Sequence, residues 1–206
     1  LAAGAEQGQP RTVPLYPASE ASAARPRAPL FSELPAWQAA EDVREACRRS
    51  QVVCVQGETG CGKSSVIPML FLDDPHAKIA VTQPRRIAAI SLAQRVASTR
   101  GEAVGQSVGY RVAMDGEVSD KTRLSFVTTG WLLMYLAHRP DALHRYTHIV
   151  LDEIHERDLD MDLLCLLLKK NLAKSSKLRL VLMSATVDAS QFLSYFAGPG
   201  VRAESG

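Results

Sequence analysis

The stretch QVVCVQGETGCGKSSVIP, residues 51–68, decides how the rest of the chain is interpreted. It places a short, β-branched apolar run directly before a glycine-rich segment that ends in a lysine and two serines. The apolar run predicts a buried strand, and the residues from Lys63 onward predict a helix. A glycine-rich turn in this setting binds phosphate, because its backbone N–H groups can point inward and the helix presents its positive end. The segment therefore predicts a phosphate-binding loop.

The loop fits the pattern GxxxxGK[ST], which assigns a role to its last positions. Lys63 is expected to neutralise the β- and γ-phosphates of a nucleoside triphosphate, and the Ser64 hydroxyl to complete the coordination of Mg²⁺. The nucleotide-binding positions predicted from the loop are Gly57, Glu58, Thr59, Gly60, Cys61, Gly62, Lys63, Ser64 and Ser65.

The composition is that of an ordinary globular protein. At 206 residues the chain is long enough for one domain with a sizeable core. Hydrophobic residues make up 46% and charged residues 22% of the chain, which excludes disordered and fibrous classes. Because the formal net charge is only +2, a nucleic-acid site must be a local patch. We expect one folded unit and a monomer.

Neither the cysteines nor the apolar runs suggest a metal centre, a disulfide framework or a membrane span. The four cysteines form no CxxC pair and have no histidine at metal-ligand spacing. Reduced thiols of an intracellular protein fit this pattern, which does not separate nucleus from cytoplasm. No apolar run approaches the roughly 20 residues that cross a bilayer. Because the chain starts at Leu1 without a charged-then-apolar leader, we expect an excerpt of a longer protein.

Two regions differ in their sequence pattern. Residues 1–30 are rich in Ala, Pro, Gly and Ser without apolar periodicity, which predicts a flexible linker. In residues 31–206, apolar runs alternate with helical patterns, which predicts one α/β domain with a mostly parallel sheet. The stretch 106–114 is expected to add a strand or a β-ribbon before MDGE, which looks like a turn. Strands are expected near 51–56, 78–82, 124–128, 148–152 and 179–183, and helices near 63–72, 86–99, 130–138, 159–173 and 189–196.

The helix expected near 159–173 carries leucine at positions 163, 164, 166, 167 and 168. This density is too high for a surface helix. We therefore expect these leucines to pack in the core rather than to contact a ligand.

A second motif supplies the carboxylates that a phosphate loop needs. The run HIVLDEIHE, residues 148–156, ends its apolar part in Asp152 and Glu153. Because ligands of open parallel sheets bind beyond the carboxyl ends of the strands, Asp152 is expected to lie beside Lys63. Asp152 would hold Mg²⁺, commonly through water, and Glu153 would border the metal and deprotonate the attacking water. An apolar run ending in Asp-Glu is otherwise an ordinary strand terminus, so the pairing with the loop carries the interpretation.

Five sequence motifs, taken together, resemble those of a known family. GETGCGKSS, TQPRRIAA, TTGWLLMYL, LDEIHERD and MSAT, in this order and spacing, resemble the first RecA-like domain of DEAH-box RNA helicases, in the variant whose box reads DEIH. The resemblance covers about residues 30–200. It implies a P-loop NTPase with a RecA-like three-layer fold that binds ATP, or other nucleoside triphosphates, with Mg²⁺. It also implies that Lys63, Asp152, Glu153 and His155 form the catalytic set.

The same resemblance assigns coupling and base-binding residues. His155 matches the family histidine that links the nucleotide site to the second domain, although a lone histidine is more often a hydrogen-bonded, partly buried residue. Ser184 and Thr186 match the SAT motif that couples hydrolysis to strand separation; on spacing alone they are hydroxyls suited to capping a helix. Arg95 matches an arginine that stacks on the nucleotide base.

The RNA contacts implied by the resemblance follow two strands. They are Arg85, with Arg86, Thr82 and Gln83 as weaker candidates, and Thr128, Thr129 and Gly130, which supply hydroxyl and backbone N–H donors. Without the resemblance, adjacent arginines are usually a solvated pair. Because phosphate contacts carry little sequence information, binding should be nearly independent of sequence and sensitive to salt. These residues do not separate RNA from DNA.

The sequence departs from the family in three places. The loop ends in GKSS, with Ser64 and Ser65, where GKTT is more common, and Ile154 stands where alanine is more common; serine also offers a hydroxyl to Mg²⁺, and both changes are small. Because the chain stops at Gly206, we also expect the second RecA-like domain, with its arginine finger and the other half of the RNA cleft, to be missing from it. We expect the chain to be the first motor domain of an ATP-driven RNA helicase. By itself, this domain should bind nucleotide, bind RNA weakly and hydrolyse little ATP. The alternatives are a nucleotide-dependent RNA- or protein-binding module without unwinding activity, and another P-loop enzyme such as a kinase or a DNA translocase.

Overall fold

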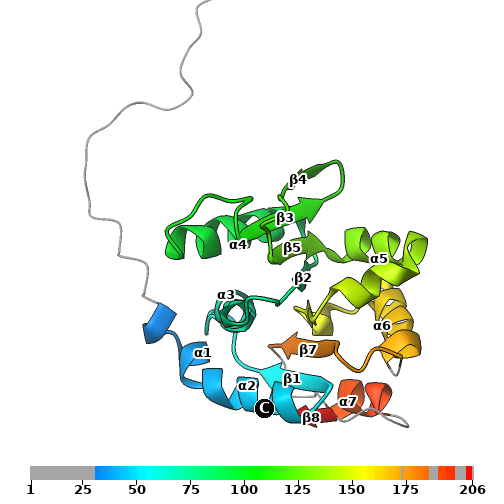
Figure 1. Ribbon diagram of the computed structural model, residues 1–206. Coiled ribbons are helices and arrows are strands. Elements are labelled where there is room, and N and C mark those ends of the chain that lie inside the picture. Colours follow the sequence, from blue (N-terminus) through cyan, green and yellow to red (C-terminus); the bar gives the residue numbers. More distant parts are fainter. Residues whose placement is uncertain (1–30, 173, 186–189, 198–202, 206) are drawn as a thin grey trace, which may run out of the picture.

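The computed structural model describes residues 31–172, 174–185, 190–197 and 203–205, and its core is an eight-stranded sheet of order β4-β3-β5-β2-β6-β7-β1-β8 (Figure 1). Within these residues the strand pairings are parallel except that of β3 with β4. The strands are β1 (Val52–Gln56), β2 (Ile79–Gln83), β3 (Val108–Val112), β4 (Asp115–Glu117), β5 (Leu124–Thr128), β6 (His148–Leu151), β7 (Arg179–Ser184) and β8 (Ala203–Ser205). The α-helices are α1 (Pro35–Gln38), α2 (Ala40–Arg49), α3 (Lys63–Leu70), α4 (Arg86–Thr99), α5 (Thr129–His138), α6 (Leu159–Leu172) and α7 (Ser190–Phe196). Short 3₁₀ helices are η1 (Phe31–Glu33), η2 (Phe71–Asp73), η3 (Pro140–Arg145) and η4 (Ile154–Glu156).

Successive side chains of the strands pack into two separate cores, one on each face of the sheet. In β1, Val53 and Val55 pack into the core that α1 to α4 cover, whereas Val52 and Cys54 pack into the core that α5 to α7 cover. This alternation follows from the two-residue period of a strand. Burial on both faces explains why the strands read as continuous apolar runs. Figure 1 shows the two groups of helices on opposite sides of the sheet, and this three-layer arrangement confirms the predicted fold class.

The strand order brings distant parts of the chain to one edge. β1 and β2 follow each other along the chain, but β6 and β7 lie between them in the sheet. Because these strands are parallel, their carboxyl ends share one edge. The segment after β6 therefore lies close to the loop after β1, at the point where ligands of open α/β sheets bind.

Two local expectations are corrected. The 106–114 ribbon exists, but its turn lies at Ala113 and Met114, and Asp115–Glu117, expected in the turn, form β4. Met114 adopts a left-handed φ of +62°, as tight turns require. The helix near 63–72 ends at Leu70 and continues as η2. Among the described residues, no helix is long and apolar enough to cross a membrane.

The leucines of α6 do not all lie in the core as expected. Leu164 and Leu168 are fully buried, but Leu163 and Leu166 are 43% and 42% exposed. Only one face of α6 packs on the sheet, and the run of leucines is wider than that face.

Candidate nucleotide site and nucleic-acid groove

The glycine-rich loop joins β1 to α3, as predicted, and its backbone depends on glycine at two positions. Gly60 and Gly62 have φ of +87° and +94°, a region that side chains disfavour. Gly62 is the N-cap residue of α3, and its carbonyl accepts the Val66 N–H at 2.8 Å. A Cβ on Gly62 would also come within 2.8 Å of Leu34 Cδ1. The N-terminal segment of the domain therefore packs directly against the loop and holds its shape.

Lys63, the first residue of α3, is buried and satisfied by the loop itself. Its ammonium donates to the carbonyls of Gly57 and Glu58, the latter at 2.9 Å, and lies 3.7 Å from Cys61 Sγ. These contacts fold the side chain back against the loop and place its charge beside two of the loop carbonyls. The Cys61 side chain therefore helps to position the Lys63 ammonium.

Asp152 follows β6 and is only 1% exposed. The Gln83 amide donates to its Oδ2 at 2.6 Å, and the Glu153 N–H donates to its Oδ1 at 2.9 Å. Burial raises the pKa of Asp152, opposed by hydrogen bonds from Ser64, Gln83 and the Glu153 backbone and by the charge of Lys63. The structure thus brings Ser64, Lys63 and Asp152 together across 89 residues of sequence (152 − 63).

Glu153 adopts a left-handed φ of +52°, which costs a non-glycine residue about 1–2 kcal/mol. Such strain gathers at functional sites, where surrounding contacts sustain it. Partial burial raises the pKa of the Glu153 carboxyl, and the charge of Asp152 raises it further, while His155 and Lys63 lower it. A half-buried carboxyl with a raised pKa is a stronger base than an exposed one.

His155 connects the acidic pair to β7. Its Nε2 lies 3.5 Å from Glu153 Oε2, and its Nδ1 lies 3.4 Å from the hydroxyl of Ser184 at the end of β7. Three residues predicted to act in catalysis and coupling therefore form one chain of contacts. Thr186, the other predicted coupling residue, lies outside the described residues.

Arg95 acquires a partner that the sequence did not predict. It is exposed on α4, and its guanidinium carbon lies 5.9 Å from the centre of the Phe31 ring. This is within the range of a cation–π contact. Phe31 belongs to η1 and is itself 8% exposed, so a buried ring of η1 supports the exposed arginine.

The predicted RNA contacts on β2 need correction. Thr82 and Gln83 are 0% and 3% exposed. Gln83 turns its amide to Asp152, and the Thr82 hydroxyl accepts the Asp152 N–H at 3.3 Å. Both side chains therefore support the nucleotide carboxylate. Arg85 is exposed and forms a loose ion pair with Glu156 at 3.9 Å.

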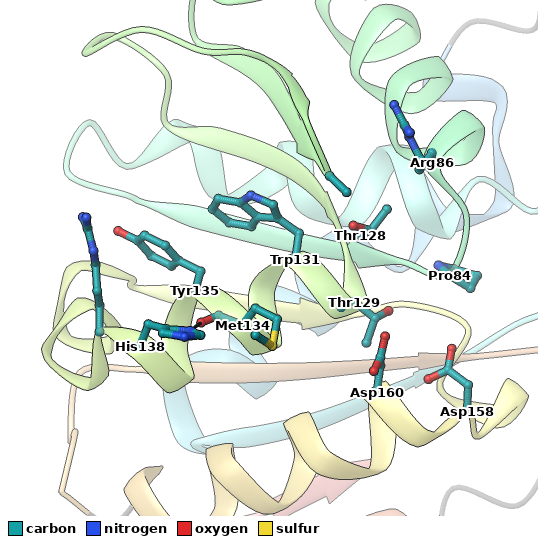
Figure 2. Close-up of a pocket in the computed structure, with 13 residues that line it drawn as sticks. Pro84, Arg86, Thr128, Thr129, Trp131, Met134, Tyr135, His138, Asp158 and Asp160 are labelled. Atoms are coloured by element: carbon teal, nitrogen blue, oxygen red, sulfur yellow. Dashed lines mark hydrogen bonds between the residues drawn. The ribbon is translucent and has the colours of Figure 1, made fainter.

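The remaining predicted contacts line a groove of about 680 Å³ between the start of α4 and α5. Arg86, Thr128, Thr129 and Gly130 all border it, and Figure 2 shows Arg86 at one end of the lining residues. Thr129 is corrected in part, because its hydroxyl is buried and faces the Gln83 carbonyl at 3.4 Å. At positions 129 and 130 the first turn of α5 has backbone N–H groups without intrahelical partners.

Sequence reasoning missed most of the wall of this groove. Trp131, Met134, Tyr135 and His138 of α5 line it (Figure 2). Their spacing of i, i+3, i+4 and i+7 is the signal that would have identified one helix face. Asp158 and Asp160 line the groove from the side of α6.

The two aspartates have structural tasks. Asp158 Oδ1 accepts the Met161 N–H at 2.7 Å, which caps α6. A Cβ on Gly130 would come within 2.5 Å of Asp160 Oδ2, so glycine allows α5 and α6 to approach closely there.

Comparisons with known proteins agree with this geometry. The model of the DEAD/DEAH box helicase family matches residues 37–193. The chain is 43% identical over 186 residues to a probable ATP-dependent RNA helicase spindle-E of Anopheles gambiae, covering 84% of the chain and 13% of the relative. It is 43% identical over 171 residues to the Arabidopsis thaliana DExH-box ATP-dependent RNA helicase DExH1, covering 80% and 17%. It is 45% identical over 170 residues to the putative ATP-dependent RNA helicase DHX57 of Homo sapiens, covering 79% and 12%.

The chain therefore spans less than a fifth of the length of these relatives. The family model covers most of the three-layer fold, from α1 to α7, and both of its functional loops. On these grounds the chain belongs to the DEAD/DEAH box helicase family.

Proposed function

We propose that this chain is the first motor domain of an ATP-dependent RNA helicase. In this proposal it binds ATP with Mg²⁺ through the glycine-rich loop and the DEIH box, and grips single-stranded RNA at the groove beside α5. The observation that carries the proposal is the meeting of Lys63, Ser64 and Asp152 at the carboxyl edge of the sheet. The printed names of the relatives, which are ATP-dependent RNA helicases, support it.

To bind phosphate, the Lys63 ammonium must exchange its present hydrogen-bond acceptors for phosphate oxygens. Its ammonium now donates to two neutral carbonyls of the loop. Phosphate oxygens are charged acceptors, and hydrogen bonds to them are roughly twice as strong as neutral ones. In a loop of this type the free backbone N–H groups and the N-terminus of the following helix attract the same anion. We expect the lysine to swing from the carbonyls to the terminal phosphates when nucleotide binds.

The donors beside the loop fit magnesium. Ser64 offers a hydroxyl and Asp152 a carboxylate, both hard oxygen ligands, and Mg²⁺ is commonly held by one or two carboxylates plus substrate phosphates. Among the described residues, no group of three or more His, Cys, Asp or Glu side chains could hold a metal by itself, which agrees with a shared site. The ion would neutralise charge on the β- and γ-phosphates. Asp152 would hold it in the ionised form that Gln83 stabilises.

Hydrolysis requires a base for the attacking water, and Glu153 has the properties of one. The water oxygen forms a bond to the γ-phosphorus while the bond to the bridging oxygen of ADP breaks, and the water proton passes to the Glu153 carboxylate. The raised pKa of Glu153 favours this transfer. His155, 3.5 Å from the same carboxylate, would orient it. Through its contact with Ser184 on β7, it would transmit the change in the protonation of Glu153 to that strand.

A second RecA-like domain of the parent protein would complete this site. Arginine fingers contribute about 10³ to 10⁵ in rate in related NTPases. We therefore propose that the isolated chain binds nucleotide as a monomer but turns it over slowly. The four cysteines are free thiols in the structure, which supports the proposal of an intracellular protein.

The test is steady-state ATP hydrolysis with and without single-stranded RNA, by a longer protein that includes the proposed second RecA-like domain. Glu153→Gln is the control, because it keeps the shape of the side chain and removes the base. Strong stimulation by RNA that Glu153→Gln abolishes supports the motor. Turnover no higher than that of the control would contradict it and favour a nucleotide-dependent binding module.

A further inference from the structure

Four side chains, from β3, α5 and the residue after α5, form a stack in which two aromatic rings lie between two guanidinium groups. The rings of Trp131 and Tyr135 stack with centroids 4.9 Å apart and planes at 13°. Arg111 of β3 lies 5.7 Å from the Trp131 centroid, and Arg139, directly after α5, lies 6.0 Å from the Tyr135 centroid. These four residues are named the ladder below. Each guanidinium packs on a ring face, so its N–H edge stays available for an acceptor.

The ladder borders a second cavity, of about 370 Å³, which is distinct from the nucleotide site. Lys78 and Arg145 also line it, so four cations face one small space that contains a single carboxylate, that of Asp120. Among the described residues, Arg111, Arg139 and Arg145 form no ion pair with a carboxylate. The cavity therefore holds an excess of positive charge that the protein does not balance.

Lys78 shows that this charge is felt inside the cavity. Its ammonium donates to the Thr122 carbonyl, which fixes the segment before β5. Burial lowers the pKa of Lys78, and the charge of Arg111 lowers it further, with only Asp120 opposing. A concave surface with unbalanced positive charge attracts anions. Because guanidinium groups match phosphate oxygens in pairs, a phosphate is the anion that the arginines fit best.

The cavity adjoins the groove beside α5. Trp131, Tyr135 and Arg139 line both spaces. Figure 2 shows Trp131 and Tyr135 following each other along the groove wall, with Thr128 and Arg86 toward its other end. From Thr129 to Arg139 the helix spans roughly 15 Å at 1.5 Å per residue. A strand held at the first turn of α5 can therefore reach the cations by following the helix.

We propose that this cationic cavity binds backbone phosphates of single-stranded RNA that leaves the groove at residues 128–130 and continues along α5. The inference rests on the RNA binding proposed above and extends the contact surface to Arg111, Arg139, Arg145 and Lys78. The aromatic rings of the ladder present π-faces that accept any base, so the added contacts are sequence-independent. Each phosphate contact adds to the salt dependence of binding, because it releases counterions from the RNA.

The test uses the tryptophan of the ladder as the reporter. The chain has two tryptophans, so Trp37→Phe leaves Trp131 as the only one. Trp37 lines neither cavity and is 40% exposed. Trp131 emission is titrated with oligouridylates of about 6 and about 12 nucleotides at two salt concentrations. Arg111→Ala and Arg145→Ala are compared with Lys174→Ala, which removes one exposed charge outside both cavities.

We expect each arginine variant to weaken the longer oligonucleotide about 3- to 10-fold, with a salt slope smaller by about 0.7 for each lost contact. The short oligonucleotide and the Lys174→Ala control should change less than twofold. Equal losses for both lengths, or no loss for either arginine, would overturn the extended track. Pyrophosphate alone tests whether the cavity binds a free phosphate compound instead of RNA. If pyrophosphate saturates the Trp131 signal and RNA does not compete with it, the extended track is also overturned. Failure of even the short oligonucleotide to bind the parent Trp37→Phe protein would instead contradict the proposed RNA binding itself.

Discussion

Replacing Gln83 by leucine tests how strongly the sheet supports the nucleotide carboxylate. The Gln83 amide donates to Asp152 at 2.6 Å, and the two residues are 3% and 1% exposed, so solvent cannot replace the bond. A hydrogen bond to a charged group contributes about 1.5–3 kcal/mol. Leucine is close to glutamine in volume, so the lost hydrogen bond dominates over any cavity. We expect Gln83→Leu to lower the free energy of unfolding by about 1.5–3 kcal/mol at pH 7.

The pH dependence of this loss has a definite sign. Burial raises the pKa of Asp152, so the folded protein is penalised as pH rises through that pKa, and the Gln83 donor reduces the penalty. Removing the donor raises the pKa of Asp152 further. The loss should therefore be full above the folded-state pKa values of both proteins and should shrink as pH falls through them.

Urea unfolding of four proteins measures the coupling: wild type, Gln83→Leu, Asp152→Asn and the double variant. In the Asp152→Asn background the partner is neutral, so the cost of Gln83→Leu should fall to about 0.5–1.5 kcal/mol. An equal cost in both backgrounds, or a loss below about 0.5 kcal/mol at pH 7, would refute the charged hydrogen bond as the source of stability.

Three further outcomes follow from the geometry. Lys63→Ala should weaken a fluorescent ATP analogue at least about tenfold in a titration, because the phosphates lose their charged donor, and an unchanged Kd would contradict the site. Leu164→Ala should lower the free energy of unfolding in urea by about 2–5 kcal/mol, and Leu163→Ala by less than about 1 kcal/mol, because only Leu164 is fully buried. Burial lowers the pKa of His148, which stacks on Phe71, from 6.5 to about 4, so stability should fall as pH drops across this window. At about 1.4 kcal/mol per pKa unit the loss is about 3 kcal/mol, and urea unfolding of His148→Phe between these pH values should lack it.

The phosphate loop was predictable because its signal is local. Gly60 and Gly62 need positive φ within a few residues of each other, and Lys63 follows directly, so neighbours in sequence are neighbours in space. The strands of the sheet were predictable for a similar reason, since burial on both faces produces continuous apolar runs. The ends of elements were less so, as the early turn at Met114 shows.

Gln83 shows where sequence reasoning met its limit. The family resemblance placed this residue on the RNA side, but β2 and β6 are paired, and the pairing turns the amide to Asp152, 69 residues away. The same holds for the ladder, because Arg111 meets Trp131 only through the pairing of β3 with β5. No pattern within one element reports which strand will be its neighbour.

The sequence by itself determined the class of fold, the phosphate loop and the identity of the acidic pair, because each depends on residues that are close together in the sequence. The tertiary structure alone decided that Gln83 supports Asp152, that His155 joins Glu153 to Ser184, and that the face of α5 forms a groove. The physical reason is that these contacts depend on strand order and on which face of each helix the sheet covers. Both are set by the burial of the whole core and by no single segment.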